Sequence, residues 1–309
     1  MKVIDKLNDC FKKRQKCFSF EYYPPKTEEG LEKFYPRIMR MSELRPCFID
    51  VTWGTGDPTS LRSIDVSQRI QAETGIETMM HLTCTDRSKA EIHDILKVLE
   101  SSEIQNIMAL RGNAPNGSPW QPHPQGFEHA SELVSFIREK FGDHFCISVA
   151  AYPEGHRDGG GIQPAGYFQT EAYEKELLHL RAKVDAGADF IVTQLCFQFE
   201  RLAQFVKDCR QVGIRCPIIP GILPIHNMRV FNKIATFSAT IPENIAENIM
   251  KLENTSQDVF EDYACGLLAG QIGELQKLGF SAIHLYTLNY ERVISRVLNG
   301  SAAFTYGSG

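Results

Sequence analysis

The sequence predicts a single-domain α/β protein with the fold of a (β/α)8 TIM barrel, and three observations support this prediction. Short apolar runs rich in β-favouring residues occur eight times along the 309 residues. Segments with helical periodicity separate these runs, and strand and helix alternate about every 25 to 40 residues. Such a repeat is typical of a barrel whose parallel strands are apolar throughout. An open doubly wound sheet is the alternative that the pattern leaves.

The predicted strands are bounded by turn residues, and a longer stretch precedes the eighth. In order they are 18–23 (FSFEYY), 48–53 (FIDVTW), 77–83 (ETMMHLT), 106–112 (NIMALRG), 145–152 (FCISVAAY), 190–197 (FIVTQLCF), 216–223 (CPIIPGIL) and 282–289 (AIHLYTLN).

Helix-forming segments lie between these strands at 88–102, 128–142 and 171–188. The last two contain Gly142 and Gly187 where a glycine cap is expected. Residues 1–16 have no uninterrupted apolar core and no small-residue cleavage site, so they predict a short amphipathic helix and not a signal peptide.

The chain shows no linker that would divide it. Two Gly/Pro-rich segments, 113–126 and 153–166, each follow a strand and precede a helix, so we interpret them as long loops on the active-site face. We therefore expect one barrel domain over residues 1–300 and a disordered tail over 301–309.

Composition limits the classes of partner. A net charge of −5 and a pI near 6.0 give no reason to expect nucleic acid or an anionic membrane, so a small-molecule substrate fits better. The nine cysteines form no C-x-x-C pair and are typical of reduced, packed thiols in a cytoplasmic protein. No window approaches the roughly 18 apolar residues of a membrane span.

Polar residues gather where the predicted strands end, which in a barrel is the catalytic face. Any one of them could simply satisfy loop carbonyls, but the set predicts a site. Its members are Glu21, Thr52, His81, Thr83, Arg111, Asn113, Tyr152, Glu154, His156, Gln194, Tyr286 and Asn289.

Several reactions find no support in this set. No lysine lies in a predicted strand, which disfavours Schiff-base chemistry. The histidines form no H-x-H or H-E-x-x-H pattern, so we predict no metal site, and His284 within its strand indicates a hydrogen-bonded core residue. GTGDPT at 54–59 lacks the third glycine of a dinucleotide fingerprint.

Glu21 stands out because it is an acid inside an apolar strand, where an isolated charge is costly. It could face solvent on an edge strand or pair with a Lys or Arg. Alternatively, burial raises its pKa so that it acts as a general acid near neutral pH. A site with one acid, one arginine and several amides suits an organic cofactor that brings its own reactivity.

The motifs SFEYYPPK, DVTWG, HLTC, LRGN, VAAYPEGH, KVDAGADFIVTQLCF, IIPGILPI and HLYTLN, spread over residues 19–289, resemble the methylenetetrahydrofolate reductase family. The resemblance implies a barrel that holds FAD without a Rossmann unit. It further implies ping-pong chemistry, in which NADPH or NADH reduces the flavin and 5,10-methylenetetrahydrofolate then takes the hydride to become 5-methyltetrahydrofolate. The sequence does not decide between NADPH and NADH.

The resemblance also implies roles for individual residues. Glu21 matches the general acid that protonates folate nitrogen 10, and Asn113 takes the place of an acid beside the flavin. Substrate contacts are implied for Glu21, Gln194, Tyr286 and Leu288. Flavin contacts are implied for Thr52, His81, Arg111, Gly112, Asn113, His129, Ala150, Tyr152, His156, Glu176 and Lys183.

Some positions depart from the family pattern. The family usually has LRGD where this chain has LRGN, so we expect Asn113 to weaken folate reduction while flavin reduction by NAD(P)H survives. Leu195, Cys196 and Ile234 also differ from the usual residues near the folate. Eukaryotic relatives carry a C-terminal domain that binds S-adenosylmethionine. Because this chain ends soon after the eighth strand, we expect no such regulation.

Two alternatives remain open. The protein could be a catalytically impaired flavin-binding homologue, which the loss of the acid at Asn113 favours. It could also be another pterin-using barrel enzyme, although such an enzyme would have less reason for Arg111 together with Lys183. In either case we expect a homo-oligomer.

Overall fold

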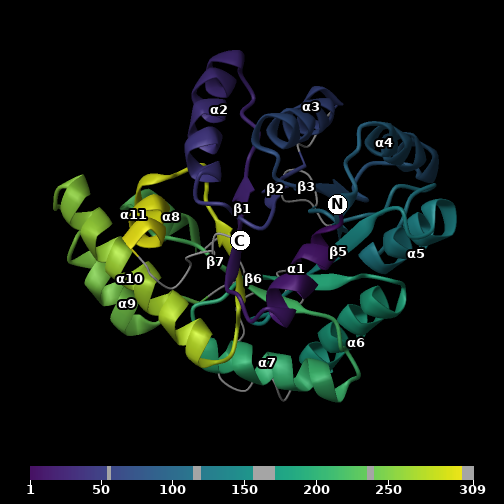
Figure 1. The fold of residues 1–309 in the computed structure, drawn as a ribbon. Coiled ribbons are helices and arrows are strands. Elements are labelled where there is room, and N and C mark those ends of the chain that lie inside the picture. The colour runs from purple at the N-terminus through teal and green to yellow at the C-terminus, as the bar shows by residue number, and fades with distance from the viewer. Residues whose placement is uncertain (54–56, 114–119, 156–170, 235–239, 301–309) are drawn as a thin grey trace.

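The computed structural model describes residues 1–53, 57–113, 120–155, 171–234 and 240–300, and its eight parallel strands form a closed barrel in chain order (Figure 1). The predicted fold class and all eight predicted strands are confirmed. Because β1 pairs with both β2 and β8, Glu21 does not lie on a sheet edge. The strands are β1 Cys17–Tyr22, β2 Ile49–Val51, β3 Thr78–Thr83, β4 Asn106–Leu110, β5 Cys146–Ala151, β6 Phe190–Leu195, β7 Ile218–Ile222 and β8 Ala282–Tyr286.

Helices form a ring around this barrel (Figure 1), and three of them separate β7 from β8. Among the described residues, none of the helices combines the length and apolarity that a membrane crossing requires. The helices are α1 Val3–Lys12, α2 Glu28–Ser42, α3 Asp57–Thr74, α4 Lys89–Ser101, α5 Ala130–Phe141, α6 Glu171–Asp185, α7 Phe199–Gln211, α8 Met228–Ile234, α9 Glu243–Met250, α10 Gln257–Lys277 and α11 Arg292–Gly300.

The predicted helix boundaries have local causes. Helix α4 begins with a capping box, in which the Ser88 hydroxyl accepts from the Glu91 amide and the Glu91 carboxylate accepts from the Ser88 amide. Gly142 and Gly187 follow α5 and α6 with φ of 55° and 115°, a conformation that favours glycine. The predicted amphipathic helix at the N-terminus is confirmed as α1.

The long loops predicted at 113–126 and 153–166 follow β4 and β5 and fall in part on residues outside the described ranges. The tail predicted for 301–309 lies wholly outside them.

Alternate residues of each strand face the inside of the barrel or the surrounding helices. Phe18, Phe20 and Tyr22 of β1 pack in the layer between strands and helices. Helix α1 lies across the amino end of the barrel (Figure 1), where the Val3 amide donates to Asn106 Oδ1 at 2.7 Å. A large apolar side chain that is fully buried, such as Phe20, contributes about 1.5–3 kcal/mol to the stability of the fold. The cluster that α1 closes contains Val3, Leu7, Cys10, Cys17, Cys47, Phe48, Met79, Met108, Cys146, Phe190, Val192, Ile219 and Ala282.

Gly221 explains why the seventh strand brings no side chain to the predicted site. A β-carbon at this position would lie 2.4 Å from the Thr193 carbonyl oxygen and 2.4 Å from Tyr286 Cε2. The Gly221 amide also donates to the Thr193 hydroxyl at 3.0 Å. The Tyr286 ring therefore occupies the space that a side chain at position 221 would need.

We predict that Gly221→Ala lowers the free energy of unfolding by about 1–3 kcal/mol, because the added methyl group meets backbone in a packed barrel. The matched control is Gly266→Ala in α10, where a β-carbon meets no atom within 4 Å. This control should gain about 0.5–1 kcal/mol from helix propensity. Denaturant unfolding measures both, and equal effects in the two variants would contradict the packing argument.

Candidate active site

Three ionisable side chains meet inside the barrel near the carboxyl ends of β1, β2 and β3. Glu21 and Asp50 are direct neighbours in the β1–β2 ladder. His81 Nε2 lies 3.1 Å from Asp50 Oδ2 and 3.5 Å from Glu21 Oε2. The exposed fractions of these residues are 4% for Glu21, 0% for Asp50 and 8% for His81, so the three groups interact with little water between them.

The sequence analysis did not single out Asp50. Its position shows that the inference of a single acid in this site was wrong. Glu21 is not the only acid that a strand contributes to this site. The signal was present, because Asp50 is two residues before Thr52 and so shares the inward face of β2 with a residue that was singled out. The pairing suggested for Glu21 as an alternative was with Lys or Arg, whereas its ionisable neighbours are a histidine and a second acid.

The pKa values of the cluster reflect burial and mutual charge. Burial raises the pKa of Glu21 to about 7, with His81 opposing this shift and Asp50 adding to it. Burial alone would lower the pKa of His81, but the Asp50 and Glu21 carboxylates outweigh it and raise the pKa to about 9. An imidazolium paired with Asp50, beside a Glu21 that still holds its proton, is therefore the arrangement near neutral pH.

A second polar layer lies next to this cluster, on the side of the amino ends of the strands. The Ser19 hydroxyl and His284 Nδ1 are 2.7 Å apart, and Phe48 stacks on the His284 ring with centroids 6.0 Å apart. Burial lowers the pKa of His284 to about 4, so this ring is neutral at physiological pH. His284 is thus a hydrogen-bonded core histidine, as predicted.

The Glu21, Asp50 and His81 side chains each offer one atom that could ligate a metal, all within 4.8 Å of one another. A metal ion needs the imidazole neutral, whereas the two carboxylates favour its protonated form. A metal ion would therefore have to displace the proton that His81 shares with the two carboxylates.

Positive charge lies on the β4 to β6 side of the barrel. Lys183 Nζ, on α6, donates to the Ala150 carbonyl at 2.7 Å. Burial lowers the pKa of Lys183 to about 8, Glu176 opposes this shift, and the Arg111 charge adds to it. Two cations that repel each other at the barrel rim form a site for an anion such as a pyrophosphate.

The backbone that follows β4 passes close to Thr85. Gly112 has φ of 88°, and a β-carbon there would lie 2.1 Å from Thr85 Oγ1. The Thr85 hydroxyl donates to the Arg111 carbonyl at 3.0 Å and fixes this turn. Asn113 follows and is exposed at the rim. The Arg111 guanidinium lies over the Trp120 ring, 4.8 Å from its centroid.

The residues predicted for substrate contact lie on β6, β8 and the loop after β8. Tyr286 neighbours Glu21 in the ladder, and its hydroxyl donates to the Thr193 carbonyl at 2.9 Å. Gln194 Oε1 accepts from the Leu195 amide at 3.0 Å, which orients its side chain. Leu288 has φ of 48°, an uncommon conformation for a branched residue.

Some predicted strand-end residues hold loops together. Asn289 accepts from the Tyr23 amide at 2.9 Å and donates to the Tyr23 carbonyl at 2.7 Å. Glu154 is buried and accepts from the Cys196 thiol and the Thr240 amide. These contacts account for Asn289 and Glu154 without a ligand.

The remaining predicted residues are placed less centrally or lie outside the described ranges. Thr52 follows β2 with its side chain half-buried. Half-buried Tyr152 follows β5. His129 precedes α5, half-exposed, with its ring 5.5 Å from that of His179. His156 lies outside the described residues.

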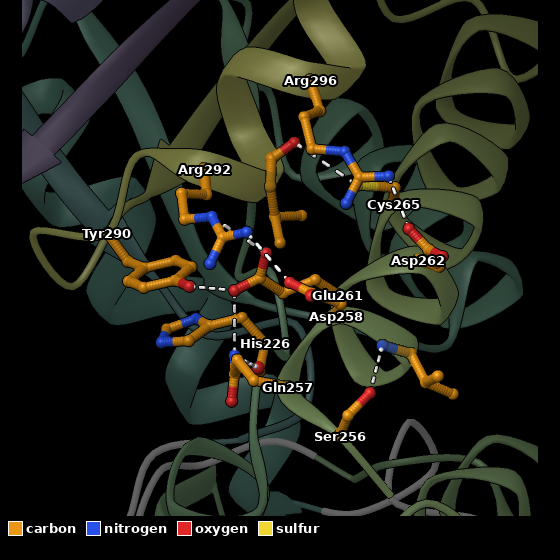
Figure 2. Close-up of polar contacts among 12 residues, drawn as sticks. His226, Ser256, Gln257, Asp258, Glu261, Asp262, Cys265, Tyr290, Arg292 and Arg296 are labelled. Carbon is orange, nitrogen blue, oxygen red and sulfur yellow. Dashed lines mark hydrogen bonds and ion pairs between the residues drawn. The ribbon is translucent and has the colours of Figure 1, made fainter.

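Figure 2 shows a further polar cluster that the sequence did not reveal, between α10, α11 and the loops after β7 and β8. Glu261 is fully buried and accepts from Gln257 and the Tyr290 hydroxyl, while Arg292 Nε lies 3.2 Å from its other oxygen. The His226 and Tyr290 rings stack at 3.8 Å. The Tyr290 and Arg292 contacts join α10 to the loop after β8 and to α11, and the ring stack joins the loops after β7 and β8, so this cluster serves to hold the β8 loop in place.

Comparison with known proteins identifies the family to which this chain belongs. The family model for methylenetetrahydrofolate reductase matches residues 6–302. A probable methylenetetrahydrofolate reductase (NADH) from Oryza sativa subsp. japonica is 42% identical over 294 residues, which cover 94% of this chain and 49% of the relative. A probable methylenetetrahydrofolate reductase (NADPH) from Caenorhabditis elegans is 34% identical, over 96% of this chain and 43% of the relative. This chain spans about half the length of the curated relatives that it matches.

Solved structures share the fold. An uncharacterized protein from Clostridium thermocellum that binds two copies of 5-methyl-5,6,7,8-tetrahydrofolic acid aligns with a TM-score of 0.64 at 15% identity, over 95% of this chain and 96% of that one. A 2,3-dimethylmalate lyase aligns with a TM-score of 0.52 at 10% identity, over 97% and 86%. At these identities the similarity shows the fold alone.

We predict that His81 makes stability depend on pH. Its pKa is raised to about 9 in the folded protein, so its stabilising contribution is fully present below its ordinary pKa of about 6.5 and is lost as the pH rises through 9. Between pH 6.5 and 9 the wild-type free energy of unfolding should fall more than that of His81→Gln, by on the order of 2 kcal/mol.

Urea unfolding at a series of pH values measures this difference. His179→Gln, on the exposed face of α6, tests whether loss of any histidine changes the slope. Parallel curves for wild type and His81→Gln would show that the His81 proton is not bound more tightly in the folded state.

Proposed function

Since this chain belongs to the methylenetetrahydrofolate reductase family, we propose that it reduces 5,10-methylenetetrahydrofolate to 5-methyltetrahydrofolate with NADPH or NADH, using FAD and Glu21 as general acid. The observation that carries the proposal is the buried Glu21 carboxyl, which keeps a proton near neutral pH at the catalytic end of a barrel.

The described residues fit a dinucleotide cofactor. Arg111 and Lys183 would hold its pyrophosphate. Gly112 lies in the same turn, where Thr85 takes the space that a side chain would need. Ala150 and Tyr152 of the β5 end, with Thr52, would contact the remainder, and Glu176 would keep Lys183 charged. When bound, FAD would supply the hydride carrier between the nicotinamide and the folate.

Glu21 would supply the proton that opening of the folate's five-membered ring requires at nitrogen 10. A neutral carboxylic acid can donate, whereas a carboxylate cannot. The buried environment keeps Glu21 neutral up to about pH 7. Tyr286 of β8 neighbours Glu21 in the ladder, and Gln194 lies on β6 with its side chain held by the Leu195 amide; both would orient the substrate.

The main alternative is an impaired homologue that binds the flavin and does not reduce folate. Asn113 favours it, because an acid at this rim position would stabilise a cationic folate intermediate. The proposed reductase and the impaired homologue differ in the folate step alone.

We predict that Glu21→Gln abolishes folate reduction, with a loss of about 10²–10⁴-fold, because Gln matches the shape of Glu but has no acidic proton. The purified protein should be yellow, and NADPH or NADH added without oxygen should bleach the flavin band equally in wild type and variant. Wild-type folate reduction should also decline as the pH rises above about 7.

Stopped-flow absorbance separates the two half-reactions. Glu32→Gln, on an exposed position of α2, is the matched control and should behave as wild type. A wild-type protein that stays colourless after incubation with FAD would reject the proposed function, and an active Glu21→Gln variant would reject the role of Glu21.

We predict that Asn113→Asp speeds folate reduction about tenfold or less, because an exposed charge is screened by solvent. Flavin reduction by NAD(P)H should change less, so the effect is read from the ratio of the two rates. Asn299→Asp, exposed on α11, controls for the added charge. If Asn113→Asp leaves that ratio unchanged, the amide at this position is not what limits the folate step.

A further inference from the structure

We propose that Asp50 is a positioning residue that holds His81 as an imidazolium, so that the proton of Glu21 remains on Glu21 for donation. This inference deepens the proposed function and rests on it for the role of Glu21. The arrangement of the three side chains, however, can be tested without any activity. It adds Asp50 of β2, the first residue of the DVTWG motif, to the residues that act in the site.

The geometry favours Asp50 as the partner of His81. The same imidazole nitrogen, Nε2, faces both carboxylates, and its distance is 3.1 Å to Asp50 and 3.5 Å to Glu21. Neither contact has hydrogen-bond geometry, since His81 Nε2 and both Asp50 oxygens make no hydrogen bond within the described part of the chain. The two acids therefore compete for the imidazolium as ion-pair partners, and the shorter distance favours Asp50. Asp50 is the closer and is fully buried, with no exposed surface.

Counting charges gives the consequence. With His81 protonated and Asp50 ionised, the pair is neutral, and Glu21 can join it as a neutral acid at little electrostatic cost. Ionising Glu21 as well would leave a net negative charge in a dry interior. Below about pH 7 the cluster therefore holds two protons, one on His81 and one on Glu21.

Without the Asp50 charge the same cluster would hold fewer protons. His81 and Glu21 would then share a single proton around neutral pH, either as an ion pair or as two neutral groups. In the ion pair Glu21 is a carboxylate and cannot donate. The charge on Asp50 removes this competition because it supports the imidazolium independently of Glu21.

The other titratable groups facing the cluster do not supply this charge. Tyr23 follows β1, and the Glu21 charge is the main factor that raises the pKa of its phenol. Tyr286 of β8 has a pKa raised well above its ordinary value by burial, and Tyr152 of β5 adds to that shift. His284 of β8, one layer below, is neutral above about pH 4. Tyr23, Tyr286 and His284 are uncharged near neutral pH.

The test is the protonation state of His81, read by NMR on protein labelled with ¹⁵N in the histidine rings. The His81 signals are assigned by their loss in His81→Gln. In the wild type we expect the imidazolium pattern to persist to about pH 9. In Asp50→Asn the midpoint should move down by about 1 to 3 pH units. Ser19→Ala, which alters the layer below, should keep the wild-type midpoint.

Kinetics supply the second readout. Asp50→Asn should lower folate reduction at pH 7.5 about tenfold or more with little change in KM for the folate, and it should change the pH profile. A variant that merely disturbs packing would not shift the His81 midpoint. Should Asp50→Asn fail to fold, the wild-type His81 titration still decides.

Three results would overturn the proposal. They are a neutral His81 in the wild type at pH 7, an unchanged His81 midpoint in Asp50→Asn, and a stoichiometric metal ion that is lost on substitution of Asp50. Absence of folate reduction in the wild type would instead reject the proposed function and leave the NMR result to judge the His81–Asp50 pair.

Discussion

Closure of the barrel buries most of the inward face of each strand, and the rest of the site depends on this constraint. An acid on an open edge would simply be hydrated. Here β1 is paired on both sides, so Glu21 shares its environment with the groups that neighbouring strands project inward. Desolvation of Glu21, Asp50 and His81 follows from topology, and their interaction is strong because the surroundings have a low dielectric constant.

The interior of the barrel is apolar at its amino end and polar at its carboxyl end. At the carboxyl end, acidic and basic side chains come from different strands. Helix α1 closes an apolar amino end. At the other end the proton-carrying groups come from β1, β2 and β3, whereas Arg111 and Lys183 come from the β4 and β6 side. Under the proposed function, this separation would allow one side of the barrel to hold an anionic cofactor while the opposite side keeps Glu21 protonated. Mixing the cations with Glu21 would pair them with its carboxylate and remove its proton.

The sequence predicted the fold well because short continuous apolar runs, glycine caps and regular spacing are local signals. Glu21, Arg111 and Lys183 could also be identified. Asp50 could not be ranked, since its importance depends on lying 3.1 Å from His81, a distance set by the stagger of β2 against β3. The Glu261 cluster was equally hidden, because it joins residues of α10 to Tyr290 and Arg292, which lie farther along the chain.

Asp50 also changes what Asn113 implies. With Asn113 neutral, Glu21 had seemed the only carboxylate close to the reacting atoms. The two positions are not equivalent, however, because Asn113 is exposed after β4 and Asp50 is fully buried within β2. A charge at the rim is screened by water and salt, while a charge in the interior acts on Glu21 with little screening. Under the proposed function, the negative charge that acts most strongly on the Glu21 proton would therefore come from Asp50 of β2, and the residue at 113 would affect only the outer part of the site.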